Sequence, residues 1–180
     1  MSAEGISFKP TLRARAGELF FLALALALNV ASPFVEDVYL WASLAAIAVL
    51  SVLILKKKAV LVLVPLAFTA AAVYLTNPLL LVISSIISLI EVGFIIIYTN
   101  SVEYYFNDDG LIIRVELPVY SKTRNVPKST IAEVSVESSP VGKLLGYSNV
   151  TVKLRTGEVV NVVGVPKGDA EKLVKKFVSG

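Results

Sequence analysis

The chain has 180 residues and a formal net charge of +3; 56% of its residues are hydrophobic and only 17% are charged. A soluble domain has about 25% charged residues, so this composition indicates contact with lipid. Cysteine and histidine are both absent, which excludes disulfide bonds, Cys or His metal sites, and Ser-His or Cys-His catalytic pairs within the chain.

Charged residues are unevenly distributed along the chain. Of the 31 charged side chains (17 basic and 14 acidic), residues 1–100 hold 11 and residues 101–180 hold the other 20. This contrast predicts a membrane domain over residues 1–98, followed by a soluble domain over residues 99–180.

Four apolar segments follow one another in the first domain, at residues 16–35, 38–55, 59–75 and 79–98. About 20 residues of helix are needed to cross a hydrocarbon core about 30 Å thick, and a helix satisfies its backbone hydrogen bonds internally. The short connections between the segments favour antiparallel neighbours. We therefore expect a bundle of four transmembrane helices. It includes the first segment, which lacks a clean signal-peptide cleavage site.

The distribution of cations predicts how this bundle is oriented. Lys9, Arg13, Arg15 and the run Lys56 to Lys58 fall on one side of the expected membrane, whereas Glu36 and Asp37 fall on the other. Loops rich in Lys and Arg stay in the cytoplasm. We therefore expect a multi-pass protein of the cell membrane with its N-terminus, and everything after Tyr98, on the cytoplasmic side.

Glu91 lies inside the fourth apolar segment. A carboxylate in hydrocarbon costs about 2.5–3.5 kcal/mol on insertion scales, so it is a candidate functional group. It could carry protons, bind a cation or pair with a basic residue of a partner. Alternatively, it reaches water at the cytoplasmic end or accepts hydrogen bonds from Ser88 or Thr69.

Small residues in "SLAAIA", "FTAAA" and "SSIIS" permit close approach of helices. This approach could occur within the bundle or onto another protein, and the sequence leaves both open.

After Tyr98 the pattern changes to short alternating segments typical of β-strands. The turn sequences "NDDG" and "RTGE" each join two of these segments, because glycine supplies the positive φ of a tight turn. The final segment predicts an amphipathic helix with an apolar stripe of Leu173, Val174, Phe177 and Val178. We expect a strongly bent sheet or partly open barrel with this helix on its open end. The predicted strands are 102–106, 111–117, 119–126, 131–137, 149–154 and 158–163.

Three sequence runs resemble the bacterial pleckstrin-homology-like domain of small membrane proteins. They are "YYFNDDGLIIR", "NVPKSTIAEVSVESSPVGKLLGYSNVTVKLRTGE" and "VVGVPKGDAEKLVKKF". Val126, Pro127 and Ile131 match the middle signature, and Lys143 to Gly146 match the "LLG" element, followed by Tyr147. The resemblance implies a mainly-β pleckstrin-homology-like barrel with a C-terminal helix on the cytoplasmic face, and it implies no catalytic residues.

Three cations, Lys122, Arg124 and Lys128, lie in or just after one predicted strand. Lys122 and Arg124 share a side of this strand because side chains alternate. The cations could contact anionic lipid headgroups. Alternatively, they form a solvated strand face, with Glu116 of the preceding strand as a cross-strand partner.

The connection between residues 138 and 148 contains Leu144, Leu145 and Tyr147. Loops of this kind often recognise other molecules. The alternative is that Leu144 and Leu145 fill the end of the barrel.

These patterns predict a non-enzymatic membrane protein, without cofactor or metal, that presents its cytoplasmic domain for protein interaction as a scaffold or accessory subunit. The expected partners are membrane lipids and a protein partner or second copy, and we expect no nucleic-acid binding. Two alternatives stay open: a small proton- or ion-linked transporter that uses Glu91, and anionic-lipid sensing through Lys122, Arg124 and Lys128.

Overall fold

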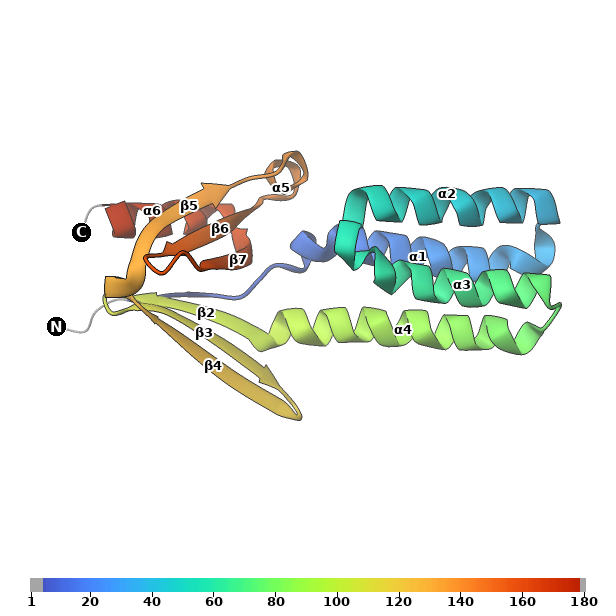
Figure 1. Ribbon diagram of the computed structural model, residues 1–180, viewed down its shortest axis with the longest axis horizontal. Coiled ribbons are helices and arrows are strands. Elements are labelled where there is room, and N and C mark those ends of the chain that lie inside the picture. Colours follow the sequence, from blue (N-terminus) through green and yellow to red (C-terminus); the bar gives the residue numbers. More distant parts are fainter. Residues whose placement is uncertain (1–4, 179–180) are drawn as a thin grey trace. The chain divides into compact units, whose positions relative to one another are not determined.

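Figure 1 shows the computed structural model of the chain, which describes residues 5–178 and, for residues 176–178, the backbone alone. The chain divides into two compact units. Arg15–Ile95 forms the helical unit, and Met1–Ala14 together with Ile96–Gly180 forms the sheet unit. Each unit has its own hydrophobic core.

The helical unit contains four α-helices. Their sequences are apolar, so the backbone N–H and C=O groups have few polar side chains to bind and form hydrogen bonds with one another within each helix. The end of the last helix, from Ile96 onward, belongs to the sheet unit. The helices are α1 (Ala16–Ala31), α2 (Asp37–Leu55), α3 (Val60–Tyr74) and α4 (Pro78–Ser101). Single 3-10 turns accompany them: η1 (Leu12–Arg15), η2 (Ser32–Phe34) and η3 (Lys56–Ala59).

Three helical stretches among the described residues are long and apolar enough to cross a membrane: Leu12–Phe34, Asp37–Tyr74 and Pro78–Ser101. The second has 38 residues and contains α2, η3 and α3. The chain folds back within it at Lys56, whose φ is +54°, so that α2 and α3 lie side by side (Figure 1). The four spans expected from the sequence are therefore not confirmed, since only three stretches qualify.

The core of the helical unit consists of apolar side chains from all four helices. Pro65 inside α3 is also buried, and its carbonyl oxygen accepts a hydrogen bond from the hydroxyl of Ser84 at 2.8 Å. The buried apolar residues are Phe21, Leu22, Ala25, Leu40, Leu44, Val62, Leu66 and Ile95.

A buried polar network joins α1, α3 and α4 inside this apolar surrounding. The side-chain amide of Asn29 donates to the carbonyl oxygen of Leu81 at 2.7 Å and to the hydroxyl of Ser85. The amide oxygen of Asn29 accepts from the hydroxyl of Thr69 at 3.2 Å, and that hydroxyl lies 2.9 Å from the hydroxyl of Ser84. Because hydrocarbon offers no hydrogen bonds, such groups must find partners on neighbouring helices.

A buried carboxylate marks the start of α1. Glu18 is only 4% exposed. One of its oxygens lies 3.0 Å from the guanidinium of Arg15 and 2.6 Å from the ammonium of Lys58. The ion pair with Lys58 connects α1 to the lysine turn η3, so Lys58 has a structural contact within the helical unit.

The sheet unit contains seven strands in two antiparallel sheets. The first sheet has the order β1-β2-β3-β4 and the second the order β5-β6-β7. All six predicted strands are present; 131–137 has the predicted ends, and the other five have at least one end shifted by one to three residues. The first sheet comprises β1 (Ile6–Phe8), β2 (Val102–Asn107), β3 (Gly110–Leu117) and β4 (Tyr120–Pro127), and the second comprises β5 (Ile131–Glu137), β6 (Tyr147–Leu154) and β7 (Val159–Pro166).

Strand β1 was not predicted, and it lies in the N-terminal part of the chain that the sequence assigned to the membrane domain. It pairs antiparallel with β2, with Phe8 opposite Tyr104. The ring of Phe8 stacks on those of Tyr104 and Phe106, with centroids 5.4 and 6.0 Å apart. Residues 5–14 therefore belong to the sheet unit.

The predicted "NDDG" turn is confirmed between β2 and β3. The side-chain oxygen of Asn107 accepts hydrogen bonds from the backbone N–H groups of Asp109 and Gly110, at 3.1 and 3.0 Å. Gly110 has φ +143°, and a Cβ there would lie 2.1 Å from the carbonyl oxygen of Val126. Only glycine fits this position.

The two sheets share one core, but they do not form a closed barrel. No strand pairing joins the two sheets within residues 5–178. A backbone bond from Thr11 N–H to Gly164 O (2.9 Å) instead links the segment after β1 to β7. The strands thus form two antiparallel sheets around one core, where the sequence predicted one strongly bent sheet or a partly open barrel. The fully buried core residues include Phe106 and Leu111 from the first sheet and Val150, Val152, Val162 and Val165 from the second.

The C-terminal helix α6 (Lys167–Val178) contacts all three strands of the second sheet as well as β1. Leu173 of the predicted stripe is fully buried in the core, and Val174 is half-buried. The side chains of Phe177 and Val178 lie outside the described residues. The helix therefore covers the core as expected.

Replacing Glu18 with alanine should lower the free energy of unfolding by roughly 1–3 kcal/mol. The substitution leaves the guanidinium of Arg15 without its carboxylate, although partial exposure of Arg15 and Lys58 reduces the cost. Unfolding of the detergent-solubilised protein by titrated denaturant, followed by circular dichroism, measures the change. Lys57→Met, at the exposed neighbouring lysine, is the matched control. Equal stability of the two variants would show that the ion pairs contribute nothing.

Candidate functional site

Strand β4 places two of the predicted cations on one face. In the register of β3 and β4, Lys122 lies opposite Val115, and Arg124 lies opposite Ile113. Ile113 and Val115 pack against the core, so both cations lie on the same side of the first sheet as these residues, although Lys122 is exposed and Arg124 is half-buried. Charged side chains on an edge strand hinder a second chain from pairing with it.

Arg124 has a partner that the sequence analysis did not identify. Its guanidinium lies 2.7 Å from a carboxylate oxygen of Glu158, in the turn between β6 and β7. The predicted cross-strand partner, Glu116, instead lies 3.7 Å from Arg114 on its own strand. Arg124 is therefore part of an ion pair between the two sheets, and the expected pairing with Glu116 is wrong.

Lys128 lies apart from the other two cations, in the 3-10 turn η4 (Lys128–Thr130) that follows β4. It lines a cavity of about 640 Å³ beside β5. Arg155 also lines this cavity, so two cations from different loops meet at one edge of the sheet. The remaining lining residues are Ser129, Ile131, Ala132, Glu133 and Val134.

The strand beside this cavity has an open edge. Among the described residues, β5 pairs with β6 alone, and the register is irregular between Ile131 and Glu133. On β6, Lys153 places its ammonium 2.9 Å from a carboxylate oxygen of Glu133. The hydrogen bond to Glu133, with the attraction of its charge, raises the pKa of Lys153.

The predicted connection between residues 138 and 148 contains a short helix, α5 (Pro140–Leu145). The hydroxyl of Ser139 accepts a hydrogen bond from the Gly142 N–H at 3.0 Å and caps its start. Gly146 ends the helix with φ +75°. The capping hydrogen bond at Ser139 and the left-handed conformation of Gly146 thus fix the two ends of α5.

The apolar residues of α5 are mostly exposed. Leu144 is 86% exposed and Val141, one turn earlier, is 56% exposed. Leu145 is half-buried, and its carbonyl oxygen accepts from the guanidinium of Arg13 at 3.2 Å. Tyr147, also half-buried, begins β6 opposite Pro166. The alternative in which Leu144 fills the end of the barrel is therefore wrong.

Glu91 lies in α4 with its Oε2 atom buried and without a hydrogen-bond partner. The two predicted donors are used elsewhere. The hydroxyl of Thr69 bonds to the carbonyl oxygen of Pro65 and to Asn29, and that of Ser88 bonds to the carbonyl oxygen of Ser84. The expected hydrogen bonds from Ser88 or Thr69 to Glu91 are therefore absent.

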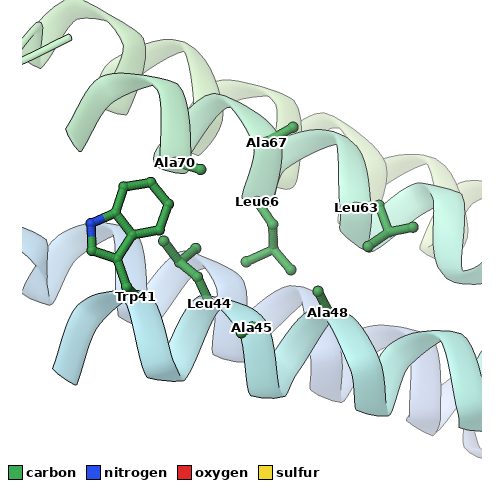
Figure 2. Close-up of a pocket in the computed structure, with 8 residues that line it drawn as sticks. All are labelled: Trp41, Leu44, Ala45, Ala48, Leu63, Leu66, Ala67 and Ala70. Carbon is green, nitrogen blue, oxygen red and sulfur yellow. The ribbon is translucent and has the colours of Figure 1, made fainter. Parts of the chain in front are cut away.

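Figure 2 shows an apolar groove of about 440 Å³ between α2 and α3. Ala45 and Ala48 of the "SLAAIA" run and Ala70 of the "FTAAA" run line it, and the indole of Trp41 stands at one end. Small side chains in these runs thus leave space between the two helices. The groove is lined by Trp41, Leu44, Ala45, Ala48, Leu63, Leu66, Ala67 and Ala70.

The succession of an apolar helical region, two antiparallel sheets and a covering C-terminal helix agrees with one family. The family model of the bacterial PH domain matches residues 19–178. The chain belongs to the bacterial PH domain family. The match begins within α1, so the apolar helices are part of what the family model describes. Comparison with curated proteins gave no match, and neither did comparison with solved structures.

This bacterial PH domain protein brings together residues that sequence reasoning did not connect. Arg155 meets Lys128 at the β5 cavity, and Glu158 meets Arg124 across the sheets. Neither pair lies within one strand or one hairpin, so no local pattern could have indicated it. Across residues 5–178, no group of three or more acidic residues is arranged to hold a metal ion.

Replacing Glu91 with glutamine should raise the thermal midpoint of the detergent-solubilised protein by about 2–4 °C. The amide keeps the shape of the side chain and removes a charge whose buried oxygen has no partner. Nanoscale fluorimetry gives the midpoint, with Glu103→Gln in the sheet unit as a control for loss of one carboxylate. A lower midpoint would show that the charge of Glu91 has a stabilising partner.

Proposed function

We propose that this chain is a non-enzymatic accessory subunit of a membrane assembly, whose bacterial PH domain binds an extended segment of a partner protein at the edge of β5. The observation that supports this proposal is the cavity of about 640 Å³ along the open edge of that strand. An extended peptide can add to such an edge through its backbone, while side-chain pockets give specificity.

The chemistry of the cavity favours one kind of segment. Ile131, Ala132 and Val134 provide apolar contacts, and Lys128 and Arg155 provide positive charge at the same edge. Glu133 is already bound to Lys153, which leaves the cavity with a cationic character. The proposed ligand is therefore an extended segment with alternating apolar side chains and at least one carboxylate.

We also propose four membrane spans with both ends of the helical unit in the cytoplasm. Because β1 pairs with β2, residues 6–8 and 102–107 occupy the same side of the membrane. The number of crossings between them must then be even. Folding of the 38-residue stretch back on itself at Lys56 turns three helical stretches into four crossings. The run Lys56 to Lys58 favours the cytoplasmic side for both ends.

Single cysteines test this topology, since the natural chain has none. In intact cells, an impermeant maleimide should label Glu36→Cys and Asn77→Cys. It should label Lys57→Cys and Thr156→Cys only after permeabilisation. Labelling of Lys57→Cys from outside, or protection of Asn77→Cys, would contradict the four-span arrangement.

The proposed docking role is tested by purification from native membranes in gentle detergent, followed by mass determination of the intact particle. We expect a stoichiometric protein partner. The double variant Lys128→Glu/Arg155→Glu should reduce its recovery about tenfold or more, because reversal of two interfacial charges costs several kcal/mol.

The matched control is the double variant Arg114→Glu/Lys172→Glu, which reverses two exposed cations away from the β5 cavity. Its partner recovery should equal that of the natural chain. A protein that purifies without a partner would overturn the accessory role, and equal recovery from both double variants would overturn the β5 edge as the docking site.

A transport role for Glu91 stays a prediction. In the sequence, the charged residues between Glu18 and Glu91 all lie in two short connections, Glu36 and Asp37 and the run Lys56 to Lys58. A proton or ion pathway normally uses several ionisable groups in succession. Loss of transport in Glu91→Gln, with the partner retained, would favour transport over the accessory role.

A further inference from the structure

One end of the sheet unit is marked by the two points where the chain enters and leaves the helical unit. The first is the passage from Ala14 to Arg15, and the second lies within α4, whose residues from Ile96 onward belong to the sheet unit. Strand β2 begins at Val102, directly after the end of α4 at Ser101. Val102 therefore lies at the end of the sheet that is closest to α4, a stretch long and apolar enough to cross a membrane.

The hairpin of β3 and β4 extends beyond this end. Strand β3 runs antiparallel to β2 with Val115 opposite Val102, and it continues for two more residues to Leu117. At about 3.3 Å per residue, this places Leu117 roughly 7 Å beyond Val102 along the direction of the strands. The tip of the hairpin, Leu117–Tyr120, thus extends past the start of β2.

The tip is apolar and exposed. Val119 is 97% exposed and Tyr120 is 51% exposed. Pro118 is also exposed. Lys122, two residues farther along β4, is an exposed cation on the same hairpin. A soluble domain gains nothing from such a tip in water, since each apolar side chain there costs free energy of hydration.

The helix α5 lies at the same end of the sheet unit. Strand β1 runs antiparallel to β2, toward the end at which β2 begins. Beyond it, the N–H of Thr11 donates to the carbonyl oxygen of Gly164 in β7, and the guanidinium of Arg13 donates to the carbonyl oxygen of Leu145. Arg13 is two residues before the passage at Arg15. The exposed Val141 and Leu144, with the exposed cation Lys143 between them, therefore gather near the first entry point.

We propose that the β3–β4 tip and the apolar face of α5 insert into the headgroup region of the bilayer, with Lys122 and Lys143 against anionic lipid phosphates. The β3–β4 tip and α5 each combine exposed apolar residues with a nearby cation, and the tip also contains Tyr120. This composition is typical of segments that lie in the membrane interface, about 5–10 Å deep. A bilayer is the occupant that we propose at this end, because α4, a candidate membrane span, passes directly into β2.

This inference is independent of the proposed protein partner. The β5 cavity is formed by η4, β5 and Arg155, and none of its lining residues belongs to the tip or to α5. Failure of the docking experiment would leave the lipid contact unaffected, and failure of the lipid experiment would leave the docking site unaffected.

Fluorescence quenching in the full-length protein tests the proposal. Single cysteines at Val119 and Leu144 are labelled with an environment-sensitive fluorophore, and the protein is placed in nanodiscs of phosphatidylcholine and phosphatidylglycerol. Lipid that carries a nitroxide near the headgroup should reduce emission at both positions by about half or more. Both positions are highly exposed, so the substitutions do not disturb the core. Thr156→Cys, in the exposed turn between β6 and β7, is the control and should show little quenching.

The double variant Lys122→Glu/Lys143→Glu should weaken quenching at Val119 when phosphatidylglycerol is present, and the control Lys172→Glu should not. Absence of quenching at Val119 would overturn insertion of the tip. A blue-shifted label that the nitroxide lipid does not quench would show contact with protein and would also overturn it. Unchanged quenching in the charge-reversed variant would overturn the assignment of the two lysines to lipid phosphates.

Discussion

The direct passage of α4 into β2 constrains the rest of the sheet unit. No linker separates Ser101 from Val102, and Val102 is itself a buried core residue. The last residues of α4 belong to the same compact unit as the first sheet. Strand β2 fixes the register of β1 on one side and of β3 on the other. The proposed interfacial contacts depend on this junction, because it is the start of β2 that follows a candidate membrane span directly.

Charge in the protein serves several separate purposes that composition could not distinguish. Arg124 links the two sheets through Glu158, and Lys58 helps to bind a buried carboxylate in the helical unit. Lys128 lines the β5 cavity. The three cations in or just after β4 therefore do not form one headgroup pocket. The proposed lipid contact uses two exposed lysines, Lys122 next to the β3–β4 tip and Lys143 in α5.

Local patterns predicted most of the elements, because each depends on residues close in the chain. Apolar runs predicted the helices, and Gly110 with Asn107 predicted the first hairpin. Strand β1 could not be predicted in this way, since three residues carry too little periodicity and its partner lies far along the chain. The same holds for the candidate site, where Lys128 and Arg155 come from different loops. Whether the strands form one sheet or two depends on packing between residues far apart in the chain. Local sequence patterns therefore did not predict the division into two sheets.

Pairing of β1 with β2 imposes an order on biosynthesis. Phe8 leaves the ribosome first, but its partner Tyr104 follows about a hundred residues later, or roughly 5–20 s at ordinary translation rates. During this interval all four helices are synthesised while β1 is still unpaired. The stacked rings of Phe8, Tyr104 and Phe106 can form only after the last helix has emerged. Completion of the first sheet therefore requires that the whole helical unit has already been made.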